Sequence, residues 1–135
     1  MAFEQATTTQ AKSVALTHLA TGTLKMALYT AAADLTSATT VYTTTGEVSG
    51  TGYTAGGQIL TNVTVNTSGT TAYLSFDNVT WSPASFTARG ALIYNTSLGN
   101  LAVAVLDFGA DKTATTSFTV QVPANTATSA LIRFA

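Results

Sequence analysis

Alternation of apolar and polar residues is the main signal along this chain. The clearest case, residues 23–30, places Leu24, Met26 and Leu28 on one side. Successive side chains of a strand point to opposite faces of a sheet, so this period of two predicts a β-strand with one face in a core.

Residues 86–94 and 101–108 form the strongest pair of predicted strands. Both carry apolar residues on both faces, and residues 95–100 between them are polar and glycine-containing. Strands that are apolar on both faces are covered on both sides. We therefore predict that this pair lies centrally in the fold.

Shorter strand signals occur elsewhere in the chain. They are predicted at residues 59–65, 72–76, 79–82, 118–122 and 130–134, with a further short piece around 41–44. Residues 66–70 have the composition of a hairpin turn, and the glycine-rich residues 46–57 that of an irregular loop. About eight short strands without a sustained helical period predict a single all-β domain over residues 1–135, an antiparallel β-sandwich or jelly roll.

The N-terminal residues 1–22 fit two structures. Ala11, Val14 and Leu19 have helical spacing, and threonines before them are suited to cap a helix. Val14 and Leu16 also alternate as in a strand. We favour a short helix or arm here.

The composition is unusual in its charge. Charged residues make up 8% of the chain, against roughly 25% in average soluble domains, and threonine occurs 29 times. Soluble β proteins usually protect exposed sheet edges with lysine, proline or inward charges. We expect partners to cover the edges of this protein, although short edges and threonine hydroxyls are an alternative protection.

Charge and cysteine content also bear on the choice of partner. The net charge is −1, and the five lysines and arginines are scattered, so no basic patch predicts nucleic-acid binding. No apolar stretch approaches the roughly 18 residues of a membrane span, and the N-terminus does not resemble a signal peptide. The absence of cysteine excludes disulfides and suits assembly in a reducing cytoplasm.

Residues suited to catalysis or metal binding are few. His18 is the only histidine, so a zinc site is excluded and a catalytic triad would have to use His18. Asp107 and Asp111 flank a predicted loop and are the candidates for a calcium site, although hard cations require six or more oxygens. We predict no cofactor and no enzymatic activity.

Three segments resemble a known group of proteins. They are residues 41–57 (VYTTTGEVSGTGYTAGG), 76–95 (FDNVTWSPASFTARGALIYN) and 101–112 (LAVAVLDFGADK). These strings resemble small virion proteins of tailed bacteriophages, among them capsid decoration, or cement, proteins. The resemblance implies a structural virion protein and does not by itself choose between head and tail. The low charge, the unprotected sheet edges and the scarcity of catalytic residues favour a decoration protein on the capsid exterior, assembled in the host cytoplasm. It would bind the outer lattice of the major capsid protein, stabilise the head, and associate as a dimer or trimer.

Two sets of residues are candidates for binding. The first is a protein interface formed by Tyr42, Glu47, Tyr53, Gly56 and Gly57. The second belongs to an alternative function, a tail or fibre component that binds host glycan through Tyr42, Tyr53, Trp81 and Tyr94. The predicted core contains Leu92, Val103, Val105, Phe118, Val120 and Ile132.

Overall fold

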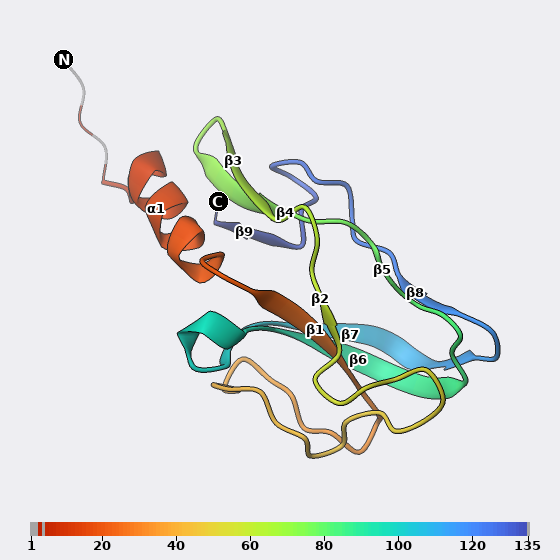
Figure 1. Cartoon of the computed structure of the whole chain (residues 1–135). Helices are drawn as coiled ribbons and strands as arrows, with labels where there is room; N and C mark the ends of the chain where they lie inside the picture. Colours follow the sequence, from red (N-terminus) through yellow and green to blue (C-terminus); the bar gives the residue numbers. More distant parts are fainter. Residues whose placement is uncertain (1–2, 4, 135) are drawn as a thin grey trace.

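The computed structural model describes residues 3 and 5–134, and these form a mostly antiparallel β-structure (Figure 1). The strands are β1 (Leu24–Tyr29), β2 (Gln58–Ile59), β3 (Thr64–Ser68), β4 (Thr71–Ser75), β5 (Val79–Trp81), β6 (Phe86–Asn95), β7 (Leu101–Ala114), β8 (Phe118–Val120) and β9 (Ile132–Phe134). The helices are α1 (Thr9–Leu19) and the 3-10 turn η1 (Thr96–Leu98). The predicted all-β, sandwich-like class is confirmed.

The largest sheet has four strands in the order β2-β1-β6-β7. β1 and β6 run antiparallel through its middle, from the pair Leu24 and Asn95 to the pair Tyr29 and Gly90. Both are rich in large apolar side chains and are almost completely buried. The strands predicted at 23–30 and 86–94 are thus confirmed, and their apolar faces explain their central place.

A second layer packs on one face of this sheet. It consists of the sheet β3-β4-β9, the pair β5-β8 and helix α1 (Figure 1). The main core lies between the layers, where Met26, Leu28 and Ile93 belong to the same buried cluster as Leu74 and Trp81. The two layers account for the sandwich-like arrangement.

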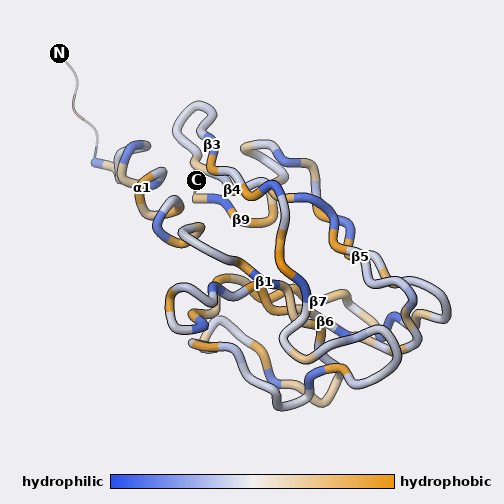
Figure 2. Tube along the Cα trace, in the orientation of Figure 1, coloured by the Kyte–Doolittle hydropathy of each residue, from blue (hydrophilic) through white to orange (hydrophobic). Residues whose placement is uncertain are grey.

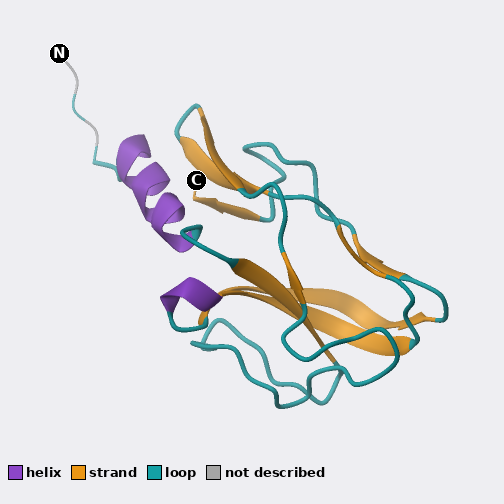
Figure 3. Cartoon of the chain, in the orientation of Figure 1, coloured by secondary structure: helices purple, strands orange, loops and turns teal. Residues whose placement is uncertain are grey.

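The opposite face of the large sheet has a different cover. Here the long segment between β1 and β2, drawn as a loop in Figure 3, lies over the sheet. It encloses a second buried cluster of Ala27, Tyr29, Leu92 and Tyr94, against which Leu35 packs. This irregular segment therefore covers the face of the large sheet that lies opposite the second β layer.

Helix α1 is the N-terminal element that we favoured, and its start follows the expected chemistry. The side chain of Thr8 accepts a hydrogen bond from the backbone nitrogen of Ala11, at 3.2 Å, and so caps the helix. Leu16 is buried against the second layer, whereas His18 is exposed in the last turn. Lys12 Nζ donates to the Thr70 carbonyl at 2.8 Å, which attaches the helix to the β3–β4 hairpin.

Two local predictions were wrong, and the bounds of a third differ. The strand predicted at 59–65 is divided into β2 and β3, with Asn62 between them at a positive φ of 54°. The piece predicted at 41–44 has only an isolated bridge between Val41 and Leu101. The hairpin predicted at 66–70 exists, but it turns at Gly69 and Thr70, because the strands continue through Ser68 and resume at Thr71.

Strand β7 is an edge strand and not the central one that its apolar residues predicted. Its pairing with β6 has two register shifts: Val103 is an extra residue, and 108–111 lie opposite the single residue Arg89. On this edge strand Val105 is 38% exposed and Val103 is only partly buried, so neither is a core residue as predicted. The other four predicted core residues, Leu92, Phe118, Val120 and Ile132, are buried as expected.

The residues that the structure describes include no helix with the length and apolar character needed to span a bilayer.

Candidate interaction surface

Five residues were predicted at an interface, and the structure gathers them around one carboxylate, that of Glu47. Tyr42 Oη donates to Glu47 Oε1 at 2.6 Å. Tyr53 Oη and the backbone nitrogen of Gly56 both donate to Oε2, the latter at 2.8 Å. Gly57 is the next residue along the chain. We call this group the Glu47 cluster.

The Glu47 cluster is attached to the large sheet through further hydrogen bonds. The Leu28 backbone nitrogen donates to Tyr53 Oη at 3.0 Å, and Tyr94 Oη donates to the Gly56 carbonyl at 2.6 Å. The rings of Tyr42 and Tyr94 stack with centroids 4.6 Å apart. The tyrosine hydroxyls that we predicted as interface anchors thus bond within the chain, and they hold the 41–57 loop on the sheet.

Burial changes the ionisation of these tyrosines. Loss of hydration raises the pKa of the Tyr53 and Tyr42 phenols above the ordinary value, and the hydrogen bond to Glu47 raises each further. The pKa of Tyr29 and that of Tyr94 are raised as well, first by burial and then by the charge of Glu47. The phenols therefore remain protonated donors to the carboxylate and the loop carbonyls throughout the neutral pH range.

Gly57 allows the loop to lie directly on β1. Its φ is +80°, and a Cβ atom there would lie 1.8 Å from the carbonyl oxygen of Met26. No other residue fits this position without moving the backbone. At Gly57 the close approach that glycine permits is therefore to the chain's own strand β1.

The outer side of the same loop is exposed and uncharged. Its exposed residues include Thr44, Thr45, Ser49, Thr51, Thr54 and Ala55. Figure 2 colours much of this segment in pale tones, between strongly hydrophobic and strongly hydrophilic. The loop therefore presents small, neutral side chains from a backbone that is fixed from beneath.

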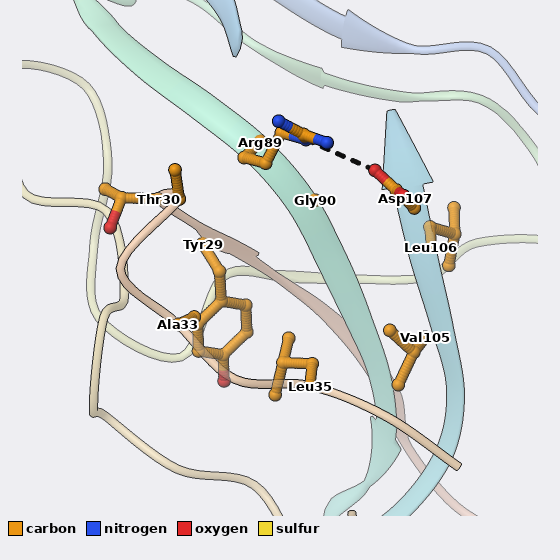
Figure 4. Close-up of a pocket in the computed structure, with 10 residues that line it drawn as sticks. Tyr29, Thr30, Ala33, Leu35, Arg89, Gly90, Val105, Leu106 and Asp107 are labelled. Atoms are coloured by element: carbon orange, nitrogen blue, oxygen red, sulfur yellow. Dashed lines mark hydrogen bonds and ion pairs between the residues drawn. The ribbon is translucent and has the colours of Figure 1, made fainter. Parts of the chain in front are cut away.

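A hollow of about 310 Å³ lies between residues 29–35 and strands β6 and β7 (Figure 4). Gly90 also lines it, and at this residue β6 lies so close to β7 that a Cβ would come within 2.5 Å of the Leu106 carbonyl oxygen. Arg89 and Asp107 line it and form an ion pair, with Nε 3.3 Å from Oδ1. Because both side chains are largely exposed, this pair contributes little to stability.

The arrangement around Asp107 differs from the loop in which Asp107 and Asp111 were candidates for a calcium site. Asp107 accepts the backbone N–H of Gly109 at 2.8 Å as well as Arg89, and these two contacts hold the pKa of its carboxyl below the ordinary value. Residues 107–111 belong to β7 and not to a loop. Within the described part of the chain, no three His, Cys, Asp or Glu side chains group as metal ligands would.

The four aromatic residues considered for glycan binding do not form one exposed platform. Trp81 and Tyr94 are buried, at 1% and 3% exposure. Tyr53 packs against Trp81 and Phe86, with ring centroids 6.3 and 5.9 Å away. Tyr42 is partly buried and stacks on Tyr94. A sugar stacked on these rings would need the loop to move away.

Sequence reasoning missed Asn95, the one buried polar side chain in the core of the described residues. Its Nδ2 donates to the carbonyls of Leu19 and Thr21 at 2.8 and 2.7 Å, and its Oδ1 accepts from the Ser97 backbone at 2.8 Å. The side chain thereby joins the end of α1 to the end of β6. An asparagine at the end of an apolar strand indicated a turn, but not this contact with a distant segment.

Comparison with known proteins adds no assignment: no family model, no curated protein and no solved structure matches this chain.

Proposed function

We propose that this chain is a structural protein of a tailed-phage particle, a decoration protein that binds the outer lattice of the major capsid protein. The proposal begins from the resemblance of residues 41–57, 76–95 and 101–112 to virion proteins of this kind. In this role the protein stabilises the head by contact alone.

The observation that carries the proposal is the immobilised, neutral outer surface of the 41–57 loop. The Glu47 cluster fixes the loop from beneath through hydrogen bonds to Tyr42, Tyr53 and Gly56. A surface that is ordered before binding loses little conformational entropy when it meets a partner. Small uncharged side chains allow close approach without removing charges from water. Both properties suit a protein that occupies one kind of site many times on a lattice.

The proposal is tested by sedimenting the purified protein with capsid shells that lack it. We expect saturable binding, with a plateau at a simple ratio to the capsid subunits. Absence of binding to mature shells would contradict a decoration role, and binding to purified tails instead would place the protein in the tail.

A matched set of variants tests whether the 41–57 loop is the contact. Thr45→Lys and Thr54→Lys place a bulky charge on the exposed side of the loop, and neither hydroxyl makes a hydrogen bond within the described residues. We expect each to weaken shell binding about tenfold or more. Thr67→Lys, on exposed β3, is the control and should bind normally. Equal weakening by all three would place the contact elsewhere.

A further inference from the structure

The N-terminal arm of this chain exposes a large apolar side chain. Phe3 is 92% exposed, and residues 5–8 between it and α1 are exposed and outside regular secondary structure. The base of the arm is fixed, because Thr8 caps α1 and Lys12 attaches the helix to Thr70. In Figure 1, residues 5–8 lie beyond the start of α1, on its side away from the sheets. The ring of Phe3 therefore has no apolar surroundings within its own copy.

An apolar hollow suited to a phenyl ring lies on another part of the molecule. It has a volume of about 330 Å³ and is formed by β7 and the β8 region, with Phe108, Phe118 and Val120 as its apolar lining. The rings of Phe108 and Phe118 are 6.1 Å apart, and Phe118 also packs 5.3 Å from Phe86. A ring placed here would extend an existing aromatic cluster, in which tilted and edge-on contacts are favourable.

The charged residues near the hollow and near Phe3 also favour insertion of Phe3 into this hollow. Lys112, Thr119 and Gln121 complete the lining of the hollow. The one ion pair among residues 3 and 5–134 joins Arg89 to Asp107, so Lys112 is available to an acidic partner. In the sequence Phe3 is followed by Glu4, which lies outside the described residues. The sequence Phe3-Glu4 thus supplies an apolar and an acidic residue, and the hollow supplies an apolar lining and a lysine.

We propose that Phe3 of one copy inserts into the Phe108–Phe118 hollow of a second copy. Arm and hollow are different surfaces, so the contact is head-to-tail unless two copies exchange arms reciprocally. This contact rests on the proposed function in one respect: it describes how copies of a lattice-binding protein contact one another. The capsid plays no part in the contact.

Engineered cysteines test the contact directly, because the natural chain has none. Gln5→Cys places a thiol on the arm and leaves Phe3 intact, and Gln121→Cys places one at the hollow. Mixed and oxidised, the two variants should form a disulfide-linked dimer. Gln5→Cys mixed with Thr67→Cys on exposed β3 is the matched control and should not. Equal cross-linking in both mixtures, or none in the first, would overturn the proposal.

Self-association measured by analytical ultracentrifugation gives a second test. Phe3→Ala should weaken it about tenfold or more, and because Phe3 is exposed this change leaves the fold intact. Lys112→Glu should also weaken it, and Glu4→Lys combined with Lys112→Glu should restore it. Unchanged association of Phe3→Ala would contradict the proposal.

The capsid-binding assay separates this inference from the proposed function. If wild-type protein fails to bind shells but self-associates through Phe3, the decoration role is wrong and the arm contact stands. If Phe3→Ala loses shell binding while its self-association is unchanged, the arm contacts the capsid. The proposed insertion of Phe3 into a second copy is then wrong.

Discussion

The two faces of the four-stranded sheet are covered by different physical means. On one face Met26, Leu28 and Ile93 pack into an apolar core shared with the second β layer. On the other face a loop is held by hydrogen bonds that converge on the carboxylate of Glu47. The free energy gained by burying apolar side chains is roughly proportional to the area buried, and it tolerates small shifts of the side chains. The carboxylate, in contrast, requires each hydrogen-bond donor at a definite position.

This difference shows how an irregular segment acquires a fixed shape. Val48 is the one fully buried large apolar side chain of the 41–57 loop, and Tyr42 and Tyr53 are partly buried, so burial alone does not define its path. A carboxylate that accepts three donors does define it, because charged hydrogen bonds are stronger and more directional than neutral ones. Four changes test the contrast, beginning with the one of largest expected effect.

Leu28→Ala should have the largest effect, because it opens a cavity in the fully buried apolar face. We expect a loss of about 2–5 kcal/mol in the free energy of unfolding, measured by urea denaturation. Val105→Ala removes apolar atoms from the exposed edge strand and should lose less than about 1 kcal/mol. Similar losses in both variants would show that the edge contributes as much as the core.

Glu47→Gln should have the next largest effect, since an amide nitrogen would then face a donor in the Glu47 cluster. We expect a loss of about 2–3 kcal/mol in the free energy of unfolding and faster proteolysis within residues 41–57. Asp111→Asn, at an exposed position with no hydrogen bond in the described residues, is the charge-matched control. A fully stable Glu47→Gln protein would mean that the loop is held by packing.

Alkaline pH should weaken the loop-covered face selectively. The pKa of Tyr29, Tyr42, Tyr53 and Tyr94 is higher in the folded chain than the ordinary value of 10.0. Their contribution is therefore complete below pH 10 and is lost as the pH rises above it, when the unfolded chain releases phenolic protons first. Unfolding free energies and tyrosinate absorbance, followed together, check this. Stability that stays constant well above pH 10 would contradict it.

Tyr53→Phe should have the smallest effect, because it removes one hydroxyl and keeps the ring. We expect a loss of about 1 kcal/mol and a weaker dependence of stability on alkaline pH. Tyr73→Phe is the matched control, since the Tyr73 hydroxyl makes no hydrogen bond in the described part of the chain. Calorimetry of the two variants should therefore show a lower melting temperature only for Tyr53→Phe.

The fold class followed from local pattern, but the position of strands in the sheet did not. Alternation located β1, β6 and β8 because it reports which residues share a face. The same apolar pattern misplaced β7, because an edge strand can be apolar where bulges and neighbouring loops cover part of it. The register shifts at Val103 and at 108–111 have no signal in an alternating pattern.

The proximity of the five predicted interface residues followed from the sequence, whereas their geometry did not, and their role at an interface stays a prediction. Tyr42, Glu47, Tyr53, Gly56 and Gly57 do lie together, as their common position in one loop suggested. Sequence could not show that the aromatic hydroxyls point inward, because this depends on Tyr94 and Leu28, which lie on strands distant in the chain. Whether the outer side of the loop binds a capsid stays a prediction.

The pairing of β1 with β6 also has a consequence for the order of events during synthesis. β1 occupies residues 24–29, and its principal partner lies at residues 86–95. A nascent chain therefore displays an apolar, unpaired β1 until most of the protein has left the ribosome. Such distant pairing closes a long loop and slows folding, so domains of this kind fold in roughly milliseconds to seconds. The donors to the Glu47 carboxylate come from residues 42–56, but the hydrogen bond from Tyr94 to Gly56 forms only once β6 has been made.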